Sequence, residues 1–263
     1  MTITFKPKQV TKKLLGTLPE RARDILIKRY GLGKEAESKT LESIGQEYGI
    51  TRERVRQIEE YSLSNIRKSD EFSKTQDIFD ELKSIVDDLG GIVSEEALLE
   101  DISSNQSTQN HIHFLLVLGD SFVKLKEDSH FKSRWSVDEK LGSKIESSIK
   151  NLYENLDDED ILPESELLES FLAHLKDISD QYKEEEILRR WLGISKKIDK
   201  NPLEEWGRAE SPNINVKGMR DYAYLVIRRH GSPIHFREVA EQITNLFNKK
   251  AHVATTHLSL IHI

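Results

Sequence analysis

Residues 51–69, TRERVRQIEEYSLSNIRKS, hold the side chains with the clearest chemical potential in this sequence. Three arginines alternate directly after a threonine, and isoleucines follow at helical spacing. In the major groove, arginine can make paired hydrogen bonds to guanine, glutamine can do so to adenine, and glutamate can accept from cytosine. A helix here would place four such side chains near its start, away from its apolar side. The predicted base-contacting residues are Arg52, Glu53, Arg56 and Gln57.

The remaining cations of this stretch suit a different task. Arg54, Arg67 and Lys68 lie where phosphate contacts are expected, and such contacts position a helix without specifying a sequence. A second interpretation stays open at this point. Charged helix faces are usually solvated, and these glutamates and arginines could simply pair with one another.

Three helices are expected to position these side chains. A helix within residues 17–31 has Thr17 and Glu20 at the spacing of a capping box, and Gly31 at its end. Thr40 is a plausible cap for a second helix that ends at Gly49. About three residues then lead to the third helix, which is the spacing of a helix-turn-helix. Its expected buried side consists of Val55, Ile58, Ser62, Leu63 and Ile66.

Charge is segregated along the chain. The net charge is −7, which is unusual for a protein that binds nucleic acid. Residues 1–70 nevertheless hold 15 Lys and Arg against 10 Asp and Glu, while residues 71–263 hold 24 against 36. A polyanion is therefore attracted to the first segment and repelled, on average, by the rest.

The segments LPERARDILIKRYGLG and KTLESIGQEYGITRERVRQIEEYSLSNIRKS resemble region 4 of the housekeeping-type bacterial sigma factors. In that family, region 4 recognises the minus-35 promoter element and docks on the flap of the RNA polymerase β subunit. The resemblance implies base contacts by Arg52, Glu53, Arg56 and Gln57, and backbone contacts by Thr51 and Arg54. The full set of predicted DNA-backbone residues is Thr40, Thr51, Arg54, Arg67 and Lys68.

The resemblance covers about a quarter of the chain, and the departures from the family matter. A functional sigma factor carries a region 2 upstream that captures the melted minus-10 strand, but here the first expected helix already begins near Thr17. We therefore expect a region 4 module within another architecture. Its predicted partners are double-stranded DNA and RNA polymerase, through the β flap or the core.

A recurring pattern of elements predicts repeated domains in the rest of the chain. Residues 73–137 read as helix, Gly-Gly break, short helix capped by Ser94, third helix and two short strands, the order of a winged helix. A similar pattern follows over residues 138–212, with Trp135 and Trp206 at matching positions near the two ends. The third helix of the first repeat carries no Lys or Arg, so direct DNA contact by that repeat is not expected. Spacing or protein docking is the expected role of both repeats.

The expected domains are residues 1–72, the two winged-helix-like repeats at 73–137 and 138–212, and a fourth, truncated unit at 213–257. The segment MRDYAYLVIRRHGSPIHFREVAEQI resembles the start of a HARE-type winged helix, the fold of the N-terminal domain of the RNA polymerase δ subunit. The last residues, 258–263, resemble a translated sequencing adaptor. We expect them to be a non-native tail, with the native protein continuing beyond His257.

Other classes of function are disfavoured by the sequence. The absence of cysteine excludes disulfides, cysteine-ligated zinc and thiol catalysis. His111 and His113 are separated by one residue, which directs them apart on a helix, so no metal site and no cofactor are predicted. No nucleotide fingerprint or catalytic triad pattern occurs, and an enzyme is not expected. Without an apolar span or a secretory signal, a bacterial cytoplasmic location at the nucleoid is expected.

We therefore predict a mostly α fold, a helix-turn-helix followed by winged-helix-like repeats with small β-wings. The predicted function is sequence-specific DNA binding in transcription, at a minus-35-like element. The alternative is a non-transcriptional DNA-targeting or protein-interaction component, for example of a restriction or defence system.

Overall fold

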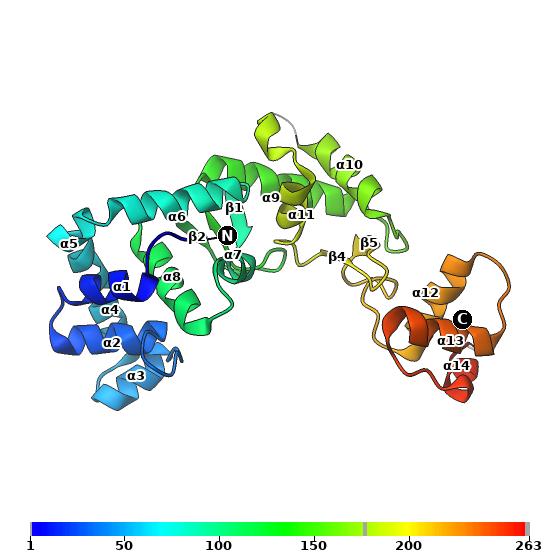
Figure 1. The fold of residues 1–263 in the computed structure, drawn as a ribbon, viewed down its shortest axis with the longest axis horizontal. Helices are drawn as coiled ribbons and strands as arrows, with labels where there is room; N and C mark the ends of the chain where they lie inside the picture. The colour runs from blue at the N-terminus through cyan, green and yellow to red at the C-terminus, as the bar shows by residue number, and fades with distance from the viewer. Residues whose placement is uncertain (1, 176–177, 261–263) are drawn as a thin grey trace. The chain divides into compact units, whose positions relative to one another are not determined.

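The computed structural model describes residues 2–175 and 178–260. The fold is mostly helical with small antiparallel sheets, as predicted (Figure 1). Within the described residues, no helix combines the length and apolar character needed to cross a membrane. The chain divides into two compact units, and the division falls within one long helix. The first unit spans Met1–Asp128 and Lys132–Gly142, and the second spans Ser129–Phe131 and Ser143–Ile263.

The first unit begins with five helices. They are α1 (Pro7–Leu15), α2 (Glu20–Tyr30), α3 (Leu41–Tyr48), α4 (Arg52–Arg67) and the short α5 (Asp70–Ser73). The predicted ends of α2 and α3 are confirmed, because Gly31 and Gly49 both adopt left-handed backbone conformations there. The predicted cap of α2 is wrong. Pro19 is the N-cap residue, and the Thr17 hydroxyl instead donates to the Leu14 carbonyl at the end of α1.

The second half of the first unit has a winged-helix-like order. It consists of α6 (Gln76–Asp88), β1 (Ile92–Ser94), α7 (Glu95–Ile102), α8 (Gln106–Leu118), β2 (Val123–Leu125) and β3 (Arg134–Ser136). Ser94 caps α7 by accepting from the Ala97 N–H, as predicted. The sheet has three strands in the order β1-β3-β2 rather than the two expected. The additional strand is very short, so its alternation could not be recognised in sequence.

A continuous hydrophobic core joins the two halves of the first unit. α8 packs on α1 and α2, and Figure 1 shows α8 beside them. The cluster includes Leu14 and Leu26 from the first half together with Ile112 and Leu115 from α8. The aromatic ring of Phe114 meets Tyr30 edge-on with 5.2 Å between centroids. The third helix of this winged-helix-like segment is therefore buried within the unit.

The second unit starts with the continuation of the long helix. Its elements are α9 (Glu139–Glu154), α10 (Glu164–His174), the 3-10 helix η1 (Asp180–Tyr182), α11 (Glu185–Leu192), β4 (Ile198–Lys200) and β5 (Trp206–Arg208). Leu162 forms a β-bridge with Trp206, as Val93 pairs with Trp135 in the first unit. The two tryptophans thus have equivalent pairing partners, so the same local arrangement occurs twice.

Three further helices follow, α12 (Met219–His230), α13 (Phe236–Phe247) and α14 (Val253–Leu260). Each packs on the other two around a small core that contains Tyr222, Val226 and Ile243. α14 includes the start of the tail that was expected to be non-native. Residues 261–263 of that tail lie outside the described residues. The domain boundaries and the non-native origin of the tail stay predictions.

Candidate nucleic-acid interface

A tight turn between α3 and α4 sets the geometry of the candidate interface. Three residues separate the two helices, as predicted. Gly49 has φ +64°, and the Ile50 N–H donates to the Gly45 carbonyl at 2.9 Å. A Cβ on Gly45 would lie 2.7 Å from the Ile50 carbonyl oxygen. The close crossing of α3 by the start of α4 therefore depends on glycine at position 45.

Threonines cap both helices of this motif. The Thr40 hydroxyl accepts from the Ser43 N–H at 3.1 Å, and the Thr51 hydroxyl accepts from the Arg54 N–H at 3.2 Å. The capping prediction for Thr40 is confirmed, and Thr51 caps α4 in the same way. The caps satisfy backbone donors that helix starts otherwise leave free. Thr40 and Thr51 are exposed, and their predicted DNA-backbone contacts stay predictions.

A small apolar cluster holds α4 against α2 and α3. Ile25, Ile44 and Val55 are fully buried, one from each helix. Burying one such side chain contributes about 1.5–3 kcal/mol. Ile58, Leu41, Tyr48 and Ile50 pack against the same cluster. The predicted buried side of α4 is confirmed at Val55, Ser62, Leu63 and Ile66, while Ile58 is half-buried.

Polar contacts also hold α2, α3 and α4 together, and the sequence did not indicate them. Lys28 of α2 forms ion pairs with Asp24 at 3.0 Å and with Glu47 of α3 at 3.2 Å. The Tyr48 hydroxyl donates to Asp24, and this contact together with Lys28 lowers the pKa of Asp24. The Tyr30 hydroxyl donates to Glu59 of α4 at 2.8 Å.

The N-terminal half of α4 presents its polar side chains to solvent. This exposed group contains every predicted base-contacting residue and Arg54, namely Arg52, Glu53, Arg54, Arg56 and Gln57. With its caps and its buried side fixed, α4 holds these side chains along one short stretch of helix. Their roles toward DNA stay predictions.

Several of these side chains also interact with one another. The Arg56 guanidinium donates to both carboxylate oxygens of Glu53, at 2.6 and 2.9 Å, and also contacts Glu60. Arg54 donates to the Gln57 side-chain oxygen at 3.1 Å. The contact with Arg56 lowers the pKa of Glu53, so this carboxylate is a hydrogen-bond acceptor at neutral pH.

The two interpretations of this face are thus compatible. The glutamate and arginine do pair, but the pairs are exposed, and solvent and salt screen exposed ion pairs. Arg52 makes no hydrogen bond or ion pair with any described residue, so its guanidinium is open to solvent.

Arg67 occupies a different environment from the other predicted DNA-contacting residues. Its guanidinium donates to the carbonyls of Val117 and Leu118, both at 2.9 Å, and lies 3.4 Å from Asp120. The side chain therefore binds carbonyls at the end of α8, where a cation is favourable. Its predicted phosphate contact stays a prediction, and Arg67 is not part of the interface proposed below because its guanidinium is bound to these carbonyls. Lys68 is exposed at the C-cap of α4.

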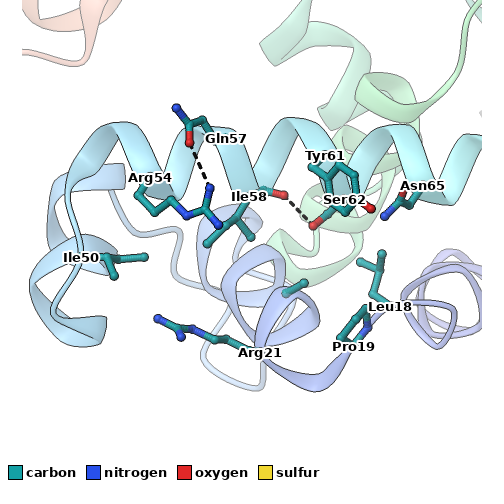
Figure 2. Close-up of a pocket in the computed structure, with 11 residues that line it drawn as sticks. Leu18, Pro19, Arg21, Ile50, Arg54, Gln57, Ile58, Tyr61, Ser62 and Asn65 are labelled. Atoms are coloured by element: carbon teal, nitrogen blue, oxygen red, sulfur yellow. Dashed lines mark hydrogen bonds between the residues drawn. The ribbon is translucent and has the colours of Figure 1, made fainter.

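A groove of about 650 Å³ runs beside this face of α4. Figure 2 shows Leu18, Pro19 and Arg21 at the start of α2 facing Ile58 and Tyr61 across the groove. Arg54 and Gln57 also line it, so the groove adjoins the candidate base-contacting residues. Tyr61 is 71% exposed, which is high for an aromatic side chain.

The histidine pair does not assemble a metal site. His111 is buried, and burial lowers its pKa. His113 lies near Glu95 and Lys124, and its pKa is lowered to about 4, chiefly by burial. Among the described residues, no group of three His, Cys, Asp or Glu side chains is arranged to hold a metal ion.

Comparisons with known proteins agree with this geometry over the first part of the chain. Residues 14–68 match the family model described as Sigma-70, region 4. This segment is therefore similar to region 4 of sigma-70 factors. The RNA polymerase sigma factor SigA of Clostridium acetobutylicum is 38% identical over 73 residues, which is 28% of this chain and 19% of the relative.

Two further relatives match a segment of similar length at higher identity. SigA of a Nostoc species is 50% identical over 56 residues, 21% of this chain and 14% of the relative. SigA1 of Synechococcus elongatus is 52% identical over 54 residues, 20% of this chain and 13% of the relative. The chain thus spans less than a fifth of these relatives. No solved structure matches it. The resemblance of residues 216–257 to a HARE-type winged helix stays a prediction.

Proposed function

We propose that this protein is a sequence-specific DNA-binding transcription factor related to sigma factors. The N-terminal half of α4 enters the major groove at a minus-35-like element. There, Arg52, Glu53, Arg56 and Gln57 contact base edges, while Arg54, Lys68 and the two capping threonines contact the backbone. The observation that carries the proposal is the exposure of this face on a capped and rigidly packed helix, within the segment similar to sigma-70 region 4.

Two features of the first unit support this role for α4. Its basic segment attracts DNA, whereas the acidic remainder of the chain is repelled on average. The third helix of the adjoining winged-helix-like segment is buried against α1 and α2. Because it is buried, that helix cannot enter a DNA groove. α4 is therefore the element of this unit that is suited to base recognition.

Selection of bound fragments from random duplex DNA tests the proposal. The full chain is the appropriate protein, because residues 1–70 share their core with α8. We expect a short enriched motif, and we expect its enrichment to disappear when Arg52 and Gln57 are both replaced by alanine. A uniform pool after repeated selection by the wild-type chain contradicts sequence-specific recognition.

We also propose a contact with RNA polymerase, at the β flap or the core, since the matched relatives are RNA polymerase sigma factors. Purification of the tagged chain from its native cells should recover polymerase subunits. The Arg52 and Gln57 variant is the matched control, and it should recover the same subunits if the contact is independent of DNA. Recovery of a nuclease or a methyltransferase instead of polymerase contradicts the transcriptional role and supports DNA targeting in a restriction or defence system.

A further inference from the structure

The sign of the charge changes twice along the chain. After the basic residues 1–70, residues 71–215 hold 17 Lys and Arg against 33 Asp and Glu. Residues 216–260, which contain α12, α13 and α14, hold seven Lys and Arg against three Asp and Glu. The last acidic residue is Glu241, so the C-terminal half of α13, the following turn and α14 carry no carboxylate side chain. A second basic region therefore lies far from α4 in sequence.

The Lys and Arg side chains of this region are exposed, and most of them form no ion pair with a described residue. Arg228 pairs with Glu205 at 3.3 Å, but none of the other six Lys and Arg forms an ion pair with a described residue. The arginines of the acidic residues 71–215 do form ion pairs, as in Arg189–Glu164 and Arg208–Asp158. In a protein of net charge −7, uncompensated cations gathered in one segment favour binding of a polyanion.

The turn between α13 and α14 presents two of these cations. Asn248 ends α13 in a left-handed conformation with φ +51°, and Lys249 and Lys250 follow it. The Lys249 ammonium lies 4.3 Å from the centroid of the Tyr222 ring, which places the turn against α12. Both lysines therefore lie just before the start of α14, on a turn that packing holds in place.

A third cation lies near the middle of α14. The rings of Phe236 and His257 are 4.6 Å apart, so the start of α13 and the centre of α14 are neighbours. Arg237 follows Phe236 and is exposed. α14 carries no carboxylate side chain, and its exposed residues are Val253, Ala254, Thr255, His257 and Leu258. A phosphate backbone that approaches α14 therefore meets no acidic side chain of that helix, while one exposed carboxylate, Glu238, lies beside Arg237 on α13.

We propose that α13, the turn and α14 form a second contact with duplex DNA, at which Arg237, Lys249 and Lys250 bind phosphates without reading bases. A short turn between two packed helices, with cations at the start of the second helix, is the arrangement that helix-turn-helix proteins place across a duplex. This contact goes beyond the proposed role of α4, because it does not depend on which sequence α4 reads.

The salt dependence of DNA affinity tests this contact. Binding of the full chain to a duplex of arbitrary sequence is measured by fluorescence anisotropy between about 50 and about 200 mM salt. Each phosphate contact contributes about 0.9 to the slope of log K against log salt. The triple variant Arg237→Gln, Lys249→Gln, Lys250→Gln should therefore reduce the slope by about 2 to 3. The charge-conserving variant Lys249→Arg, Lys250→Arg should retain the wild-type slope.

A matched control removes the same charge from the acidic region. Lys83, Lys140 and Lys144 are exposed, and their replacement by glutamine should leave the slope unchanged. An unchanged slope in the Arg237, Lys249 and Lys250 variant, with circular dichroism equal to wild type, overturns the proposal. An equal reduction in the control also overturns it. Loss of selectivity at α4 has a separate readout, the enriched motif, so failure of one proposal is distinguishable from failure of the other.

Discussion

Arginines of the same helix serve different purposes in this protein. Arg52 has no described partner, Arg56 pairs with exposed glutamates, and Arg67 binds carbonyls at the end of α8. Their spacing in sequence suggested the first two as base-contacting residues, and the structure shows both exposed. The environment of Arg67 depends on α8, which is distant in sequence, so no local pattern could reveal it.

Replacement of Arg67 by alanine should reduce stability rather than DNA affinity. Two hydrogen bonds to backbone carbonyls are lost, and each is partly screened because the side chain is 37% exposed. We expect the free energy of unfolding to fall by about 1 kcal/mol. Urea denaturation measures this change, with Lys68→Ala as the control that should leave it unaltered. A normal unfolding curve combined with weaker DNA binding would assign Arg67 to the interface instead.

His113 should make stability dependent on pH. Burial lowers its pKa from 6.5 to about 4 in the folded chain, so between these values the unfolded chain binds more protons. Stability is therefore complete above about pH 6.5 and falls as the pH decreases toward 4, by on the order of 3 kcal/mol. Denaturation at a series of pH values should show this trend, and His113→Gln should flatten it. An equal trend in the variant would exclude His113 as its source.

At the scale of elements, local signals predicted the helix-turn-helix well. The short turn, the Gly49 conformation and the cap at Thr40 were predicted because all three follow from short-range chemistry. The prediction that Thr17 caps α2 was wrong because α1 ends just before this residue. The Thr17 hydroxyl donates to a carbonyl of α1 instead. The importance of Gly45 could not be predicted, since glycine within a helix shows its purpose only when another segment crosses it closely.

Gly45→Ala should damage the turn before α4. The added Cβ would lie 2.7 Å from the Ile50 carbonyl oxygen, which belongs to backbone and cannot rotate away. A cost of about 1–3 kcal/mol is expected, together with weaker DNA binding. Thermal unfolding and duplex titration of the same preparations measure both quantities. Gly33→Ala is the control, because a Cβ at that position meets only the Ile27 side chain at 3.7 Å. Equal stability of the two variants would show that the turn tolerates the added atom.

At the scale of the whole molecule, hydrophobic patterning identified helices but not which of them share a core. Residues on both sides of position 72 share one hydrophobic core, which the sequence pattern did not indicate. The lack of Lys and Arg in α8 disfavours it as a DNA-binding helix. Charge could not show that α8 packs on α1 and α2, because every amphipathic helix has an apolar side and the sequence does not specify its neighbour.

Phe114→Ala should therefore affect the distant helix-turn-helix. Phe114 is fully buried and contacts Tyr30, whose hydroxyl bonds to Glu59 of α4. We expect a loss of about 3–5 kcal/mol and a single unfolding transition for the first unit. Hydrogen exchange of the full chain should show lower protection in both α4 and α8. Lower protection confined to α8 would indicate two independently folding halves.

The most direct test of the central claim compares two neighbouring arginines of α4. The affinity of the full chain is measured for its selected site and for every single base-pair variant of that site. Arg52→Ala should cost about 1–3 kcal/mol at the selected site and remove the preference at one base pair. Arg54→Ala should weaken binding to every duplex by the same factor. If Arg52→Ala retains every base preference of the wild-type chain, Arg52 does not read bases as proposed.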